Sequence, residues 1–224
     1  MLHQRVSETN EGIQNEFDVK DYDVFLRKMR DRSWMETNQI IKSGIDMGNA
    51  LEVGPGPGYL GLEWLKKTNN THLTGLEISK AMIAIAEANA KEYALSHDRI
   101  RYVLGNAMEM PFEDNTFDAV FSNGSLHEWE NPQRILNEIY RVLKVGGRYF
   151  VSDLKRNISA LLKSFMLSVT KPKSMRKGFT TSVQASYTKE ELHRILLVTS
   201  CKDAAIEENI MGLVVLGQKT NVSE

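Results

Sequence analysis

Three glycines spaced two residues apart stand between an apolar run and an apolar pattern of helical spacing. The run is residues 50–53, and the glycines are Gly54, Gly56 and Gly58. The helical pattern comprises Leu60, Leu62, Trp64 and Leu65. This order predicts a strand, a turn and a helix. Glycine adopts positive φ without strain, and it has no side chain that would keep a ligand away from the backbone. The start of a helix offers free N–H groups. We therefore expect the loop to bind a carboxylate, a phosphate or a ribose.

Two carboxylates accompany this loop. Glu52 lies two residues before Gly54, and Glu77 closes a second predicted strand over residues 71–78. Ligands of open α/β sheets bind outside the carboxyl ends of the strands, and the acidic residue that holds a ribose comes about 20 residues after the loop. Glu77 can thus accept both ribose hydroxyls. A solvated carboxylate at the end of a strand is the alternative.

Later strand ends carry further polar side chains. Asn106 follows the predicted strand 99–104, where its amide could hydrogen-bond the edge of an adenine or simply form a turn. His127 follows the predicted strand 117–122, and an imidazole suits proton transfer near neutrality. His127 is therefore the candidate catalytic base, with a structural role as the alternative. Four more residues could shape a substrate pocket, or could serve only as loop or cap residues. They are Tyr22, Glu128, Trp129 and Asp153.

The order of elements predicts the sheet. Five strands alternate with helices without an internal repeat, which implies parallel strands with right-handed crossovers. Two last strands, near 204–208 and 212–218, are joined too closely to be parallel. The fold class is α/β: a Rossmann-like, mostly parallel seven-stranded sheet with helices on both faces and one antiparallel edge strand. Ser79 and Thr188 are predicted helix caps, and Gly146 and Gly147 are predicted to end the helix that Pro132 opens.

Two segments outside this alternation should cover the site. The chain is expected to be one domain over 1–224, with an N-terminal helical cap at 1–47 and a basic, lid-like insertion at 154–189. Residues 1–16 are polar, and 17–45 predict one or two helices. The insertion has eight Lys or Arg and no Asp or Glu. An amphipathic helix over 158–169 should precede a flexible basic run at 171–178.

The insertion leaves several interpretations open. A lid over the acceptor pocket would suit an apolar or anionic small molecule. A basic amphipathic helix could instead lie on a membrane surface and receive a lipid-soluble substrate. Contact with RNA or phosphate is a third alternative, although no aromatic stacking array accompanies the charge. The remaining one is an ordinary solvated surface.

Bulk composition limits the classes of function. The 224 residues are 42% hydrophobic and 25% charged, which is typical of a globular protein. A net charge of −1 provides no global field for nucleic acid or a membrane. No apolar run approaches a membrane span, and the first residues lack the core of a secretion signal. Cys201 is the only cysteine and the five histidines are scattered, so we expect a cytoplasmic location and no metal site.

A series of motifs in a fixed order carries a resemblance to a known family. They are the glycine loop with Glu52, then Glu77, the segment 105–112, and the two stretches 117–123 and 141–148. Over about residues 48 to 155 the chain resembles the class I S-adenosylmethionine (SAM)-dependent methyltransferases, most of all the branch with small-molecule and quinone C-methyltransferases. A dinucleotide fingerprint counted from Gly56 does not fit, because its first glycine should follow the strand directly.

The resemblance implies a role for each matched residue. Gly54, Gly56 and Gly58 would pass close to the methionine part of the cofactor, and Glu77 would hold its ribose. Ile78 would lie against the adenine, Asn106 and Ala107 would flank it, and Asn123 would line the methionine end. The family commonly has Asp at the position of Asn106, and Pro57 stiffens the loop.

The predicted function is transfer of the SAM methyl group to a small-molecule acceptor by in-line displacement, in a monomer or homodimer. Positioning alone contributes much to such a reaction, so no unique catalytic residue is required. The alternatives are a non-catalytic SAM-binding regulator or partner protein, and a methyltransferase acting on RNA or on a membrane-borne quinone. An oxidoreductase is disfavoured by the register of the glycines.

Overall fold

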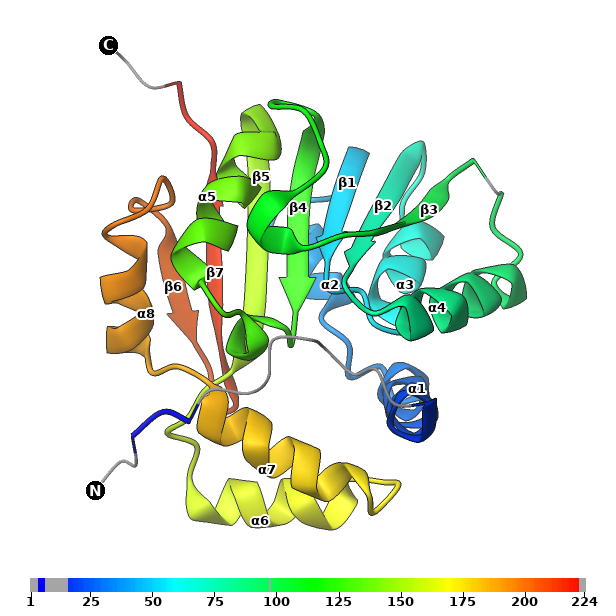
Figure 1. The fold of residues 1–224 in the computed structure, drawn as a ribbon, viewed down its shortest axis with the longest axis vertical. Helices are drawn as coiled ribbons and strands as arrows, with labels where there is room; N and C mark the ends of the chain where they lie inside the picture. Colours follow the sequence, from blue (N-terminus) through cyan, green and yellow to red (C-terminus); the bar gives the residue numbers. More distant parts are fainter. Residues whose placement is uncertain (1–3, 7–15, 97, 222–224) are drawn as a thin grey trace.

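A seven-stranded sheet in the order β3-β2-β1-β4-β5-β7-β6 forms the centre of the computed structural model, which describes residues 4–6, 16–96 and 98–221 (Figure 1). The strands are β1 (Gly48–Val53), β2 (Thr71–Glu77), β3 (Ile100–Leu104), β4 (Phe117–Asn123), β5 (Leu143–Leu154), β6 (Ala205–Glu208) and β7 (Gly212–Gln218). Neighbouring strands from β3 to β5 are parallel, and β7 is antiparallel to both β5 and β6. The predicted mixed, Rossmann-like sheet is confirmed. The reversed strand β7 lies one place in from the edge, with β6 outside it.

Helices pack on both faces of the sheet. On one face, α2 (Thr37–Lys42), α3 (Tyr59–Lys67) and α4 (Lys80–Glu92) pack near β1, β2 and β3. On the other face lie α5 (Pro132–Val142) and α8 (Lys189–Leu196). Each face has its own core because successive strand residues point to opposite sides: Leu51 and Val53 join one cluster, while Ala50 joins the other.

Local capping agrees with the sequence at two helices. The Ser79 hydroxyl accepts from the backbone N–H of Met82 at the start of α4. At the start of α8, Thr188 and Glu191 form a capping box in which each side chain accepts from the backbone N–H of the other residue. Both predicted caps are confirmed.

The predicted end of the helix after Pro132 is wrong. Helix α5 ends at Val142 and β5 begins at the next residue, so Gly146 and Gly147 belong to the strand. A Cβ on Gly147 would lie 2.8 Å from the carbonyl oxygen of Lys144 and 3.0 Å from that of Asp118. Gly147 is therefore a site of close backbone approach within the sheet, where the β4–β5 register shifts.

Three helices lie at the carboxyl ends of the parallel strands (Figure 1). They are α1 (Glu16–Asp31), α6 (Ala160–Val169) and α7 (Met175–Ala185). The prediction of a flexible run at 171–178 is wrong in part, because α7 starts within it. The buried residues of this second helix are Val183 and Ala185. The helix contacts α1 and the segment Leu126–Glu128, both far from it in the sequence. Of the polar segment 1–16, only residues 4–6 and the first residue of α1 are among those described.

Candidate functional site

The glycine loop leaves β1 in a conformation that few other residues adopt. Gly54, Gly56 and Gly58 have φ values of 69°, 53° and 85°, in the region where side chains are strained. A Cβ on Gly54 would lie 3.0 Å from the side chain of Ser125. Gly58 is the N-cap residue of α3, which places the free N–H groups of this helix beside the loop.

Glu77 lies next to this loop at the end of β2. One carboxylate oxygen accepts from the backbone N–H of Gly56 at 3.0 Å, and the other accepts from the N–H of Ser79 at 2.9 Å. Burial raises the pKa of Glu77, and these N–H donors oppose that rise. The carboxylate thus fixes the loop backbone and also faces the cavity described below.

Glu52 is the more deeply buried of the two acids, with 2% of its surface exposed. Burial, together with the nearby charge of Glu77, raises the pKa of Glu52 to about 8, and a backbone hydrogen bond from Gly61 opposes the rise. Its Oε2 has no hydrogen-bond partner in the structure. At neutral pH Glu52 is therefore mostly a neutral carboxylic acid beneath the loop.

The residues predicted to surround the adenine lie along the same edge of the sheet. Ile78 is 39% exposed, and Asn106 and Ala107 follow β3. The Oδ1 atom of Asn106 accepts from the N–H of Met108 and caps the short 3-10 helix η1 (Ala107–Glu109). The amide nitrogen of Asn106 remains the group that can donate to a ligand.

Beyond the loop, Asn123 at the end of β4 meets a carboxylate that the sequence did not suggest. Its amide nitrogen donates to Ser152 Oγ at 2.9 Å and to Glu36 Oε2 at 3.2 Å. Burial raises the pKa of Glu36, the charge of Asp153 adds to the rise, and the bonds with Ser152 and Asn123 oppose it. Glu36 belongs to the link between α1 and α2, where no motif marks it. Only the tertiary fold brings it to the site.

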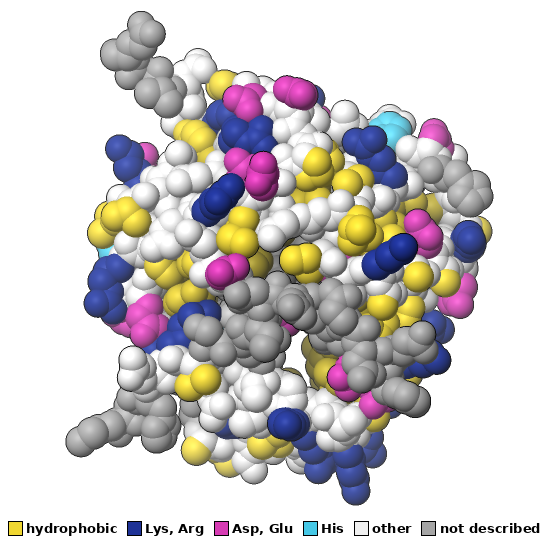
Figure 2. Space-filling model, in the orientation of Figure 1, with side chains coloured by type: hydrophobic (Ala, Val, Ile, Leu, Met, Phe, Trp, Pro, Cys, Tyr) yellow, Lys and Arg dark blue, Asp and Glu magenta, His cyan; other side chains and the backbone are white. Residues whose placement is uncertain are grey.

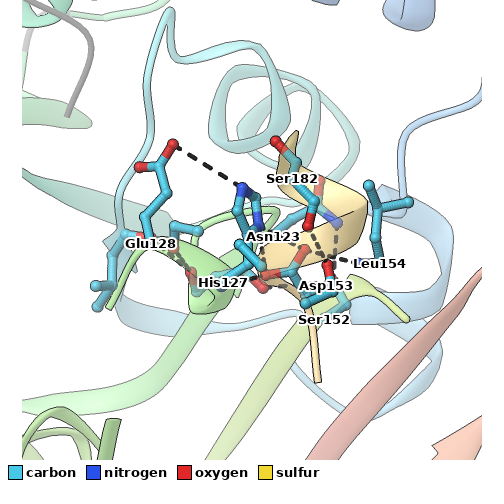
Figure 3. Close-up of polar contacts among 12 residues, drawn as sticks. Asn123, His127, Glu128, Ser152, Asp153, Leu154 and Ser182 are labelled. Carbon is cyan, nitrogen blue, oxygen red and sulfur yellow. Dashed lines mark hydrogen bonds and ion pairs between the residues drawn. The ribbon is translucent and has the colours of Figure 1, made fainter. Parts of the chain in front are cut away.

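His127 and Asp153 form a buried pair at the same end (Figure 3). The Nδ1 atom of His127 lies 2.9 and 2.8 Å from the two carboxylate oxygens of Asp153, and the backbone N–H of His127 donates to the same group at 2.7 Å. A carboxylate only accepts hydrogen bonds, so Nδ1 carries a proton; in the neutral form of the ring, Nε2 then has the lone pair. On the other side of the ring, Glu128 Oε1 lies 3.9 Å from Nε2.

One cavity of about 1090 Å³ connects all these groups. Its lining includes every predicted site residue except Gly58: Tyr22, Glu52, Gly54, Gly56, Glu77, Ile78, Asn106, Ala107, Asn123, His127, Glu128, Trp129 and Asp153. Residues of α1, α6 and α7 complete the wall, among them Phe25, Met29, Phe165, Met166 and Phe179. Since a small-molecule pocket typically measures about 300–1,000 Å³, this cavity is slightly larger than a typical pocket for one ligand.

Within the described part of the chain, no three His, Cys, Asp or Glu side chains are grouped closely enough to hold a metal ion. None of its helices is both long enough and apolar enough to span a membrane.

Comparisons with known proteins agree with this geometry. Residues 51–151 match the model of a family described as a methyltransferase domain. The ubiquinone/menaquinone biosynthesis C-methyltransferase of Roseobacter denitrificans is 34% identical over 106 residues, which are 47% of this chain and 42% of that protein. The uncharacterized methyltransferase YdaC of Bacillus subtilis is 31% identical over 118 residues, 52% of this chain and 62% of that protein. The chain thus spans less than two thirds of these relatives.

A solved structure extends the match to nearly the whole chain. A candidate S-adenosyl-L-methionine-dependent methyltransferase of Methanococcus maripaludis superposes with a TM-score of 0.77 at 25% identity, over 97% of this chain and 99% of that one. The fold is thus that of a structure described as a SAM-dependent methyltransferase, and residues 51–151, a little under half of the chain, match a methyltransferase-domain model. Within the matched region, the sequence is similar to that of a ubiquinone/menaquinone C-methyltransferase, a member of this class.

SAM is the cofactor of this class, and the residues present fit it. The loop offers bare backbone and a helix start, and the carboxylate of Glu77 borders the cavity beside them. Next to these lie the exposed side chain of Ile78 and the amide of Asn106.

Proposed function

We propose that this protein transfers the methyl group of SAM to a small-molecule acceptor. The observation that carries the proposal is the single cavity, which runs from the glycine loop and Glu77 to the pair of His127 and Asp153. It supports a cofactor at one end and an acceptor at the other. When bound, SAM supplies a methyl group on a sulfonium cation, whose carbon–sulfur bond breaks as the acceptor bond forms.

We assign the cofactor end as the sequence suggests. Gly54 and Gly56 approach the methionine part, with Gly58 shaping the turn behind them, and Asn123 lies at the methyl end. Glu77 holds the ribose hydroxyls. The adenine lies among Ile78, Asn106 and Ala107, while Glu52 supports the loop from below.

His127 acts as the general base in this proposal. Asp153 fixes the imidazole so that the unprotonated Nε2 can accept a proton from the acceptor. Glu128, which lies on the Nε2 side, Tyr22 and Trp129 shape the acceptor pocket. The helices α1 and α2 form a cap, and α6 and α7 form a lid, so that the chain works as one domain.

Isothermal titration with SAM and with S-adenosylhomocysteine tests the cofactor assignment. Both should bind, whereas a nicotinamide dinucleotide should not. Replacing Glu77 by Gln removes charge-assisted hydrogen bonds worth about 1.5–3 kcal/mol, which corresponds to roughly 10–100-fold weaker binding. Glu207→Gln, at an exposed position on β6, is the control. If neither cofactor form binds, the proposal fails.

Methyl transfer is tested separately with methyl-labelled SAM and fractionated cell extract. Label should appear in a small molecule. Cofactor binding without transfer to any fraction would instead indicate a silent SAM-binding protein.

A further inference from the structure

The charged side chains of the cavity wall are carboxylates. Among the described residues that line the cavity, none is Lys or Arg. The acidic residues of the lining are Glu36, Glu52, Glu77, Glu128, Glu130 and Asp153. Glu52 and Glu77 lie by the glycine loop, at the cofactor end. Glu36, Glu128 and Asp153 gather around Asn123 and His127, where the acceptor must reach the methyl group.

The basic side chains near this end do not supply the missing counter-charge. Arg5 donates to the carbonyl oxygens of Ala185 and His127, and Arg156 binds Glu191. Neither arginine lines the cavity.

The basic turn between α6 and α7 is also directed elsewhere. Lys171, Lys173 and Lys177 are exposed and lie outside the lining. In the space-filling view, Lys and Arg side chains gather at the lower end of the molecule, where this turn lies (Figure 2). The sequence-based expectation of an anionic acceptor rested on these charges, but they belong to the outer surface.

Much of the remaining cavity wall is aromatic or carries thioethers. It contains Phe25, Met29, Trp34, Phe165, Met166 and Phe179, which belong to α1, α6, α7 and the link after α1. Aromatic faces attract cations, and this wall also accommodates an apolar body. A buried anion without a cationic partner would be strongly disfavoured here. The cofactor's single net positive charge cannot offset all the carboxylates.

We infer that the acceptor is an amine on an apolar body, which enters as its ammonium cation between Glu36, Glu128 and the aromatic wall and is methylated on nitrogen. This inference rests on the proposed methyl transfer. It replaces the sequence-based expectation of an apolar or anionic acceptor with a cationic one.

The chemical step balances with the residues present. His127 Nε2 removes one proton from the ammonium group and thereby frees the nitrogen lone pair. This lone pair forms the new carbon–nitrogen bond as the carbon–sulfur bond breaks, and the electron pair of the broken bond stays on sulfur. The products are S-adenosylhomocysteine and the methylated ammonium ion, and His127 then releases its proton to water.

A binding experiment isolates the charge preference from turnover. The full chain is saturated with S-adenosylhomocysteine and titrated with 4-phenylbutylamine, 4-phenylbutanol and 4-phenylbutyrate, which share one apolar body. The amine should bind more tightly than the carboxylate by roughly tenfold or more. Glu36→Gln should reduce that ratio severalfold, whereas Glu207→Gln should leave it unchanged. An amine that binds no better than the carboxylate overturns the inference.

The natural acceptor provides the second readout. After incubation of cell extract with methyl-labelled SAM, the label should enter organic solvent at high pH and return to water at low pH, as only an amine product does. Label that stays in the solvent at low pH overturns the inference but leaves methyl transfer intact. Failure to bind S-adenosylhomocysteine at all would instead remove the proposed function.

A last measurement tests whether Glu36 acts on the acceptor or on the cofactor. The dissociation constant of S-adenosylhomocysteine should be the same for Glu36→Gln and the unchanged chain. Weaker cofactor binding with an unaltered amine-to-carboxylate ratio would assign Glu36 to the methionine ammonium group and overturn its acceptor role.

Discussion

At the scale of single residues, the carboxylates of this cavity differ in their surroundings rather than in their type. Glu77 receives backbone N–H groups from Gly56 and Ser79. Asp153 receives the imidazole and backbone N–H of His127. Glu52 has an oxygen with no partner. Because hydrogen bonds to the charged form favour ionisation and burial opposes it, Glu52 is expected to stay mostly protonated at neutral pH.

Replacing His127 by Gln should lower kcat by about 10²–10⁴-fold, which is the usual contribution of a general base. The affinity for S-adenosylhomocysteine should not change, because the cofactor end is left intact. Asp153→Asn should lower kcat as well, since an amide can donate to Nδ1 and so leave the proton on Nε2. Transfer of labelled methyl, measured beside titration calorimetry, checks both variants. Full activity in His127→Gln would remove the base from the proposal.

Glu52 should make the stability of the fold fall as the pH rises. Its pKa is about 8 in the folded chain, against an ordinary value of 4.5. The contribution of Glu52 to the free energy of unfolding is therefore fully present below pH 4.5. It is lost as the pH rises through 8. The loss approaches about 1.4 kcal/mol per pH unit between these values.

Denaturant unfolding at pH 5 and pH 8.5 measures this effect as a difference between two chains. Glu52→Gln, which cannot ionise, should gain stability relative to the unchanged chain by a few kcal/mol on moving to pH 8.5. Other titrating groups are common to both chains and cancel. A difference that does not vary with pH would show that Glu52 is ionised in the folded protein.

At the scale of elements, the sequence predicted what local patterns determine. The glycine loop, the caps at Ser79 and Thr188 and the two closely spaced final strands all depend on neighbouring residues. Gly147 was wrongly predicted to end a helix because part of the need for glycine there comes from the backbone of Asp118, on another strand. Glu36 was missed because it meets Asn123, 87 residues away. The roles of the site residues remain predictions.

Helix α6, which we propose as part of a lid, offers a matched pair of exposed apolar residues. Phe165 is 57% exposed and lines the cavity, whereas Leu161 is 83% exposed and does not. If α6 covers the acceptor, Phe165→Gln should raise the KM for the acceptor by roughly tenfold, the effect of about 1.4 kcal/mol of lost apolar contact. Leu161→Gln should leave KM unchanged. Equal effects of both substitutions would argue for an outer docking role instead.

At the scale of the whole molecule, the parallel strands bring distant residues to one edge of the sheet. The ends of β1, β2, β3, β4 and β5 supply Glu52, Glu77, Asn106, Asn123 and Asp153 to a single cavity. A ligand that fills this cavity contacts the ends of several strands. Binding should therefore stabilise the whole fold and not one loop alone.

S-adenosylhomocysteine at 100 times its dissociation constant should raise the free energy of unfolding by about 2.7 kcal/mol. Denaturant unfolding with and without the ligand measures this. Glu77→Gln at the same ligand concentration should show a smaller gain because its binding is weaker. No stabilisation at any concentration would contradict binding to the folded chain.

The short outermost strand β6 also affects how copies of the protein behave toward one another. Its four residues include Glu207 and Glu208, both exposed. An open sheet border with unpaired backbone groups invites strand addition from another chain, and brevity and like charges discourage it. The shortness of β6 and the charge of Glu207 should therefore disfavour the addition of a strand from another copy at this border of the sheet.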